Sequence, residues 1–253
     1  MNKKVVTKMK ILICIDDTDN LETVGTGHHA QSLKERMEEK GYGKTDFISR
    51  HQLFVHPDVP YTSHNSAMCF GAEIEESDLE AIIELSKNHL IEVSADGSDP
   101  GLAVAVVDKI ANIVKLIAFG KSAKCAILTK EMAYELALQM NIHLSEHGGT
   151  GQGIIGALAG IALRLYGSDG RIKGKCNVAS GGDTISAAEL LRITGFDGVV
   201  TTSGKKVEPQ AEIHMTDPMI KAVYLDWQQT ILVEETSDIY QLRTLYKDEY
   251  KCY

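Results

Sequence analysis

Three aspartates follow a short apolar run near the start of the chain. The run covers residues 11–15, and Asp16, Asp17 and Asp19 come directly after it. An apolar run that ends in polar residues is typical of a buried strand leading into a loop. Magnesium prefers oxygen ligands and usually takes one or two carboxylates together with the phosphates of a substrate. The pattern predicts a Mg²⁺ site made by these three carboxylates, and the alternative is an ordinary acidic turn.

Two glycines flank a threonine a few residues later. Gly25, Thr26 and Gly27 stand at the start of a helix that the apolar spacing predicts over residues 28–40. Unpaired N–H groups at a helix start favour an anion, and glycine lets a phosphate come close. We therefore predict phosphate binding here. The alternative is a flexible loop in which Thr26 only caps the helix.

A second glycine-rich segment, G-T-G-Q-G-I-I-G, covers residues 149–156. It contains G-x-G-x-x-G, which in a dinucleotide-binding fold follows a strand and precedes an acidic residue on the next strand. Residues 141–148 do not have a strand pattern, and Asp169 falls in a turn. We therefore favour an anion-binding loop before a helix over residues 154–166, with Gly151 and Gly153 at the phosphates. No Walker A motif occurs, which disfavours an ordinary P-loop enzyme.

Two further polar groups are weaker signals. Residues 60–66, P-Y-T-S-H-N-S, carry many hydrogen-bonding side chains between two predicted strands. Such loops are often functional, and the alternative is a solvated turn. His143 and His147 are four positions apart, and His28 adjoins His29. A zinc site would need further ligands, so the sequence does not favour a histidine metal site.

Taken in order, four segments resemble the archaeal tRNA-isoleucine agmatidine synthetases. The segment I-D-D-T-D-N at residues 15–20 resembles that family's I-D-D-T-D-S opening, and residues 60–67 resemble its P-Y-K-T-R-G-N-G-A loop. S-D-P-G at residues 98–101 resembles T-N-P-G, and G-Q-G-I-I-G-A-L-A at residues 151–159 resembles G-R-G-L-I-G-A-L-A. The resemblance covers residues 9 to about 175, which is most of the chain.

The resemblance implies an activity. Members of that family use ATP to attach agmatine to a cytidine of the tRNA anticodon, and their N-terminal domain is kinase-like. By analogy we expect ATP and Mg²⁺ as cofactors and a nucleotide contact from Asn65. Thr26 takes the position of the family's autophosphorylated threonine, so the resemblance implies catalytic roles for Thr26, Asp16 and Asp17.

Several positions depart from the family. The Lys and Arg of the family loop are Thr62 and His64 here, and the Arg of G-R-G is Gln152. Three cations that could hold phosphates or RNA are therefore missing, and Lys173 or Lys175 is the substitute that we consider. The family's ferredoxin-like, OB and zinc-ribbon modules follow its kinase-like domain, and this chain is too short for the full set.

The order of the expected elements indicates an α+β fold, or an α/β sandwich, with a mixed sheet and packed helices. Strands are expected over residues 11–15, 46–55, 67–74 and 125–128. Residues 176–253 differ in texture, with a short helix over 184–192, a hairpin over 199–207 and strands within 222–233. We therefore predict an agmatidine-synthetase-like domain over residues 9–175 and a small β-rich appendage over residues 176–253.

Composition sets limits on the class of protein. Hydrophobic residues make up 43% and charged residues 24% of 253 positions, which is ordinary globular usage. The net charge of −9 repels nucleic acid on average, so we do not expect direct tRNA binding without a partner. The five cysteines form no C-x-x-C pair, and no apolar run has membrane-spanning length. These features predict a cytoplasmic protein with reduced thiols and no membrane contact.

Two hypotheses remain open. In the first, the chain is an enzyme that uses ATP and Mg²⁺ for phosphoryl or nucleotidyl transfer, with amine ligation as one form, on a small molecule or an RNA supplied by a partner. In the second, the same fold binds a nucleotide without chemistry, as a regulatory module. The missing cations favour the second because transition-state charge would be poorly compensated. The retained carboxylates favour the first.

Overall fold

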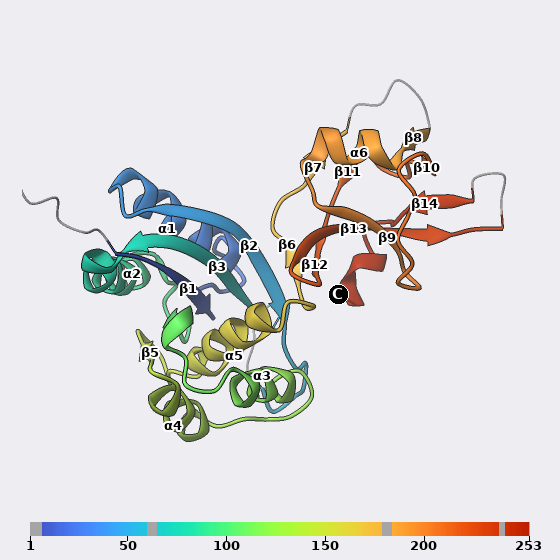
Figure 1. Cartoon of the computed structure of the whole chain (residues 1–253). Helices are drawn as coiled ribbons and strands as arrows, with labels where there is room; N and C mark the ends of the chain where they lie inside the picture. The colour runs from blue at the N-terminus through green and yellow to red at the C-terminus, as the bar shows by residue number, and fades with distance from the viewer. Residues whose placement is uncertain (1–6, 60–64, 179–183, 238–240, 253) are drawn as a thin grey trace, which may run out of the picture. The chain divides into compact units, whose positions relative to one another are not determined.

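The structure, a computed structural model, describes residues 7–59, 65–178, 184–237 and 241–252. It packs as two compact units, Met1–Tyr166 and Gly167–Tyr253, and the boundary between them falls in the yellow range of the colour bar of Figure 1. The domain boundary expected after residue 175 stays a prediction.

One antiparallel sheet forms the centre of the first unit. Its strand order is β5-β4-β1-β3-β2, and β1 pairs with β3 on one side and with β4 on the other. The strands are β1 Lys8–Asp16, β2 Lys44–Gln52, β3 Ser66–Glu75, β4 Gly101–Val106 and β5 Ile142–Glu146. The pairing register places Asp16, at the end of β1, opposite Gly101, at the start of β4.

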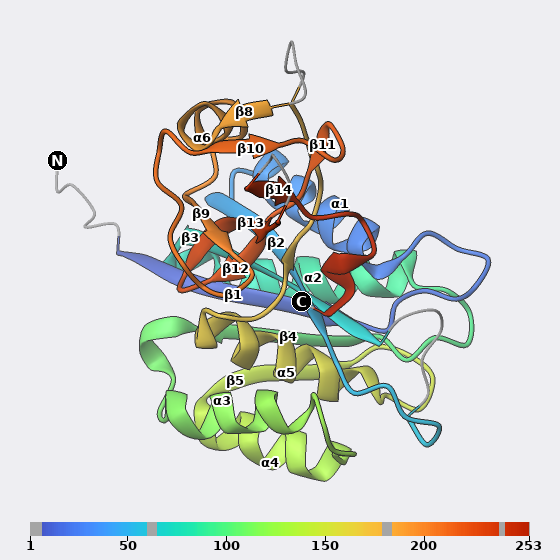
Figure 2. The same cartoon turned by 90° about the vertical axis from the view of Figure 1, so that its right-hand side faces the viewer.

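Helices cover both faces of this sheet (Figures 1 and 2). The residues of β1 alternate between them: Ile11, Ile13 and Ile15 belong to the buried cluster shared with α1 and α2, whereas Leu12 and Cys14 belong to the cluster shared with α3, α4 and α5. The helices are α1 Thr26–Glu39, α2 Leu79–Val93, α3 Ile113–Ser122, α4 Lys130–Met140 and α5 Gly153–Tyr166, with 3-10 helices at Glu76–Asp78 and Val107–Lys109. This arrangement of helices packed on a sheet confirms the predicted α+β fold.

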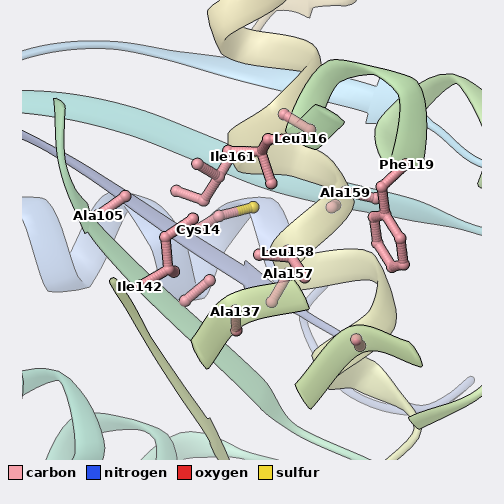
Figure 3. Close-up of a cluster of buried hydrophobic side chains, with 14 of the residues drawn as sticks. Cys14, Ala105, Leu116, Phe119, Ala137, Ile142, Ala157, Leu158, Ala159 and Ile161 are labelled. Atoms are coloured by element: carbon pink, nitrogen blue, oxygen red, sulfur yellow. The ribbon is translucent and has the colours of Figure 1, made fainter. Parts of the chain in front are cut away.

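Helix α5 runs through the middle of one buried cluster. Figure 3 shows Leu158 and Ile161 of α5 among side chains of α3, β1 and β5. A Cβ at Gly160 would lie 2.3 Å from Cys14 Sγ, so only glycine allows this close approach to β1. Near the other end of α5, the buried Arg164 donates to Asp46 Oδ2 of β2 at 2.8 Å. These contacts fix α5 against the sheet, and with it the position of its first turn.

The second unit is rich in short strands. They follow the order β6-β12-β13-β14-β10-β8, β9 adds to β13, and β7 pairs with β11. The pairs β13–β9 and β10–β14 are parallel, which confirms the predicted mixed strand arrangement. The elements are β6 Arg171–Ile172, β7 Cys176–Asn177, β8 Thr184–Ser186, α6 Ala187–Thr194, β9 Gly198–Thr201, β10 Glu212–His214, β11 Met219–Ile220, β12 Val223–Leu225, β13 Gln228–Glu235, β14 Leu242–Thr244 and a 3-10 helix at Glu249–Cys252.

Three local expectations were wrong. Residues 125–128 form no strand and instead lead into α4, while β5 lies in the segment 141–148 where no strand was expected. The helix expected from residue 184 begins at Ala187, because the first three residues form β8. Within the described ranges, none of the helices combines the length and the apolar character that a membrane span requires.

Candidate functional site

The acidic loop, which runs from Asp16 to the start of α1, begins at the end of β1. Asp16, the last residue of β1, is buried, with 7% of its surface exposed. Asp17 has φ of 52°, a left-handed conformation that aspartate tolerates better than most residues and that turns the chain out of the sheet. Asp16, Asp17 and Asp19 all line one pocket. The structure therefore brings the three predicted carboxylates together.

A chain of hydrogen bonds joins this loop to α1. Thr26, the first residue of α1, donates its hydroxyl to Asp19 Oδ1 at 2.8 Å and accepts the N–H of Thr18 at 3.4 Å. Thr18 Oγ1 in turn lies 2.8 Å from Nδ1 of His29, and both residues are buried. The Thr26 hydroxyl is thus held against a carboxylate that can accept its proton.

The start of α1 offers N–H groups to an anion. Its N-cap is Gly25, which has no side chain to accept a hydrogen bond from the first turn. The first N–H groups of a helix have no intrahelical partner and form the positive end of its dipole. Asp19 Oδ2 would lie 3.5 Å from a Cβ at Gly25, so this carboxylate stands beside the helix start. Of Gly25, Thr26 and Gly27, Thr26 lines the pocket and the two glycines do not. The phosphate-binding roles of Gly25 and Gly27 stay predictions.

The start of α5 closes the other side of the acidic loop. Gly153 begins α5 and lines the pocket, and its N–H donates to the carbonyl of Asp99 at 3.1 Å. A Cβ at Gly156 would lie 1.6 Å from Asp16 Oδ2, so the carboxylate packs against the first turn of the helix. A carboxylate near a helix N-terminus is stabilised by the helix dipole. Glycine at position 156 is what makes room for it.

Asp99 organises the glycine-rich loop. Its carboxylate accepts the N–H and, at 2.6 Å, the hydroxyl of Thr150, and also the N–H of Gly151 at 3.3 Å. The Gly151 N–H that was expected to meet a phosphate thus donates to Asp99 in this structure, and Gly151 is not among the pocket-lining residues. The phosphate-binding roles of Gly151 and Gly153 stay predictions.

Burial, with a smaller effect from neighbouring carboxylates, raises the pKa values of Asp16 and Asp17. Burial raises the pKa of Asp16 well above the usual range of a carboxyl, and the charges of Asp17 and Asp19 raise it further. Burial, followed by the charges of Asp99 and Asp19, raises the pKa of Asp17 to about 6. Both effects oppose the ionised forms, so a bound cation would relieve an unfavourable arrangement of charge.

The pocket encloses about 780 Å³, including space open to solvent, and its lining combines polar and apolar residues. The polar lining residues are Asp16, Asp17, Asp19, Thr26, Asp58, Asn65, Ser66 and Gln152. The apolar lining residues, called the apolar wall below, are Leu53, Phe54, Val59, Ala123, Ala126, Ile127, Leu128 and Ile155. Among the described lining residues, four are aspartates and none is a lysine or an arginine.

The described residues contain no group of three or more His, Cys, Asp or Glu side chains arranged to hold a metal ion by themselves. A site that takes only one or two protein carboxylates, with phosphate oxygens completing the coordination, does not require such a group. The assignment of Mg²⁺ to Asp16, Asp17 and Asp19 therefore stays a prediction.

Asn65 reaches the pocket in a supporting position. Its Nδ2 donates to the carbonyl of Phe54 at 2.7 Å, and Phe54 belongs to the apolar wall. Residues 60–64, with Thr62 and His64, lie outside the described residues. The exposed Lys173 and Lys175 belong to the second unit, and the role considered for them stays a prediction.

Sequence reasoning missed three features of the site. Asp99 was considered only as part of a turn, although an aspartate directly before Pro-Gly and a strand is a position where a side chain can hold a neighbouring loop. The apolar wall from residues 126–128 was mistaken for a strand. Arg50 was also overlooked, and its Nε donates to Oγ of Ser66, a lining residue, at 2.9 Å.

The histidines take structural positions within the described residues. His29 contacts Thr18 as above, and burial lowers its pKa. His143 and His147 flank Ser145 in the chain. The Ser145 hydroxyl contacts the Nε2 atoms of both histidines, at 3.0 and 2.8 Å. No third metal-binding side chain joins any of these groups in the described ranges.

No protein-family model and no curated protein sequence matches the chain. Solved structures do resemble it. An enzyme for the fluorescent labelling of tRNA is 28% identical, with a TM-score of 0.54, over 61% of this chain and 36% of the other. TiaS in complex with an isoleucine tRNA and ATP is 25% identical, with a TM-score of 0.57, over 72% and 43%. Ligand-free TiaS, an agmatidine synthetase for isoleucine tRNA, is 26% identical, with a TM-score of 0.52, over 61% and 35%.

These similarities confirm the resemblance that the four sequence segments indicated. The chain spans less than half the length of each of these three proteins. Their activities and partners as whole proteins therefore bear on this chain only through the proposals below.

The raised pKa of Asp17 predicts a stability that depends on pH. Because the pKa is about 6 in the folded protein and near its ordinary value of 3.8 in the unfolded chain, the folded state binds more protons between these values. Stability then falls as the pH rises from about 4 to 6. Asp17→Asn, which keeps a residue suited to the left-handed conformation, should increase the free energy of unfolding at pH 8 by roughly 1–3 kcal/mol.

The measurement is urea unfolding of the metal-free and nucleotide-free protein at pH 4, 6 and 8. The gain from Asp17→Asn should shrink as the pH falls and vanish near pH 4. Glu22→Gln, an exposed residue of the same loop, is the matched control and should show no such trend. An equal gain at pH 4 and pH 8, or a loss at pH 8, would contradict the account.

Proposed function

We propose that the chain binds ATP together with a divalent cation in this pocket and transfers a phosphoryl or nucleotidyl group. The observation that carries the proposal is the meeting of three features in one pocket: carboxylates at a strand end, an uncapped helix start and an apolar wall. The similarity to the TiaS structure determined with ATP supports it. We also propose which products ATP yields and which group accepts the transferred phosphoryl or nucleotidyl group.

The apolar wall suits a nucleobase. Phe54, Ile127, Leu128 and Ile155 offer an apolar surface on which a flat, aromatic base can stack. The sugar and phosphates would then extend toward the start of α1 and the acidic loop, where the N–H groups at the helix start favour an anion. This orientation uses both the polar and the apolar lining residues of the pocket.

The charges of the pocket require a cation. The triphosphate of ATP would meet Asp16, Asp17, Asp19 and Asp58 without a lysine or arginine among the described lining residues. Coulombic repulsion between phosphates and carboxylates would oppose binding in a partly buried site. Mg²⁺ would fit these oxygen donors, and its charge would offset the repulsion between the carboxylates and the phosphates. Asp17 and Asp19 are the ligands that we propose, and the more deeply buried Asp16 orients the loop or completes the coordination.

Thr26 is the proposed acceptor of a phosphoryl group within the chain. Its oxygen would form the bond to the γ-phosphorus, the bond between that phosphorus and the leaving oxygen of ADP would break, and the hydroxyl proton would pass to Asp19. The hydrogen bond of 2.8 Å from Thr26 to Asp19 supports this direction of proton transfer. The resemblance to the agmatidine synthetases, in which this position is autophosphorylated, supports the same role.

The final acceptor is a small molecule or an RNA that another protein presents. The similar structures include a complex with tRNA, which supports an RNA-related activity. The net charge of −9 opposes a tight grip on a tRNA by this chain alone. We therefore propose that tRNA, if it is the acceptor, is bound mainly by a partner.

A nucleotide-binding regulatory module is the second candidate. The lack of lysine and arginine among the described lining residues favours it, since developing charge in a transition state would have only the metal to compensate it. The two candidates differ in turnover: the enzyme releases ADP or AMP from bound ATP, and the module releases the ATP unchanged.

Binding of ATP should depend on the cation. With Mg²⁺ present, ATP should raise the melting temperature, because a ligand that binds only the folded state stabilises it by mass action. With EDTA in place of Mg²⁺, the shift should disappear, since the carboxylates would then face the phosphates directly. A thermal-shift titration with ATP, ADP, AMP and GTP measures this. An equal shift in EDTA would show that the carboxylates do not act through a cation.

Loss of the metal ligands should abolish turnover. Asp19→Asn should lower ADP or AMP release by at least about 100-fold, because it removes a proposed ligand and the proton acceptor of Thr26. Glu22→Gln, with the same change of charge in the same loop, should retain activity.

Intact-mass measurement after incubation with Mg²⁺ and ATP should show one added phosphoryl group on the wild type and none on Thr26→Val. Full turnover by Asp19→Asn would refute the roles given to this carboxylate.

A further inference from the structure

A polar cluster outside the pocket makes a second contact with the glycine-rich loop, besides that of Asp99. Lys130, the first residue of α4, donates its Nζ to Glu146 Oε2 at 2.5 Å and to the carbonyl of Thr150 at 2.7 Å. Tyr134, one turn along α4, donates its hydroxyl to Glu146 Oε1 at 2.8 Å. Burial and the neighbouring Glu146 raise the pKa of Tyr134 to about 12, so its hydroxyl stays a donor.

Gly151 has the geometry that this cluster requires. A Cβ at Gly151 would lie 1.6 Å from Glu146 Oε2 and 2.7 Å from Lys130 Nζ. Its φ of 75° is in the region that glycine adopts freely. The middle glycine of G-T-G-Q-G is therefore explained by the close approach of the Lys130–Glu146 pair.

The cluster joins two walls of the pocket. The apolar wall includes residues 126–128, and α4 begins two residues after Leu128, at Lys130. Thr150 comes two residues before Gln152, where the lining from the start of α5 begins. The contact from Lys130 to Thr150 thus sets the distance between the wall proposed for the base and the first turn of α5.

We propose that Lys130, supported by Glu146 and Tyr134, is a positioning residue that holds the glycine-rich loop and the apolar wall at the separation a nucleotide needs. The inference rests on the proposed function for its ligand. The loop would be fixed by Asp99 through the N–H groups of Thr150 and Gly151, and by Lys130 through the carbonyl of Thr150. Lys130 itself does not line the pocket.

The energetics agree with a local role. The side chains of Lys130 and Glu146 are 23% and 39% exposed, and partly exposed ion pairs contribute little to global stability. Removal of the pair should therefore leave the fold intact. It should release the loop, because the Thr150 carbonyl loses its bond to Lys130 and the surroundings of Gly151 become open.

The test compares Lys130→Met with Lys115→Met as the matched control. Lys115 also reaches α4 by a single hydrogen bond, to Gln139 Oε1 at 2.5 Å, but makes no hydrogen bond to the described residues of the glycine-rich loop. Lys130→Arg keeps donors for both acceptors and serves as the rescue variant. Three quantities are measured: the melting temperature, amide hydrogen exchange of Thr150 and Gly151 without ligand, and the Kd of ATP with Mg²⁺.

Lys130→Met should speed exchange of the two amides by about tenfold or more, since local opening becomes easier, while the melting temperature changes by less than about 3 °C. The Kd of ATP should rise about tenfold, Lys115→Met should match the wild type, and Lys130→Arg should recover most of the loss. Unchanged exchange, or faster exchange with an unchanged Kd, would overturn the inference. A wild type that does not bind ATP would instead refute the proposed function, and the exchange data would still decide whether Lys130 holds the loop.

Discussion

The first turn of α5 comes so close to the end of β1 that position 156 has no room for a side chain, and the carboxylate of Asp16 takes that space. The rest of the site depends on this contact. This contact requires glycine at the start of α5 and a buried cluster that packs the helix against the sheet. The close packing of Gly160 against Cys14 contributes to the same arrangement. The pairing of Asp16 with Gly101 then brings the Asp99 turn to the same edge, so the acidic loop and the glycine-rich loop meet.

The site gathers carboxylates whose charges oppose one another in the metal-free protein. Burial and mutual repulsion raise the pKa values of Asp16 and Asp17. In the absence of lysine or arginine among the described lining residues, the protein supplies compensation through helix starts alone. Such an arrangement costs stability in the empty protein, which is typical of sites selected for binding or catalysis. Under the proposed function, a cation and not a basic side chain would be the partner of the phosphates.

The sequence predicted the local elements that carry strong patterns. The apolar run of β1, the spacing of α1 and the glycine-rich start of α5 each reflect a short stretch of chain, and all three are confirmed. The segment 125–128 was wrong because a short apolar run has the same pattern whether it is a strand or one wall of a pocket. β5 was missed because its five residues hold only two aliphatic side chains, Ile142 and Leu144, which is too short an alternation to predict a strand.

The antiparallel pairing of β5 with β4 also explains why G-x-G-x-x-G does not form a dinucleotide-binding unit here, even though a strand precedes it. The role of Asp99 was beyond sequence reasoning for a different reason. Its contact with Thr150 joins residues far apart in the chain and exists only because β1, β4 and β5 are neighbours in the sheet. Local patterns do not determine such long-range contacts.

The most direct test of the central claim is a crystal structure with a non-hydrolysable ATP analogue and Mn²⁺, with anomalous scattering used to locate the metal. The account predicts the base against Phe54 and Ile127, and a manganese peak within coordination distance of Asp17 or Asp19 and a phosphate oxygen. A nucleotide bound elsewhere, or a bound nucleotide with no metal at these carboxylates, would contradict it.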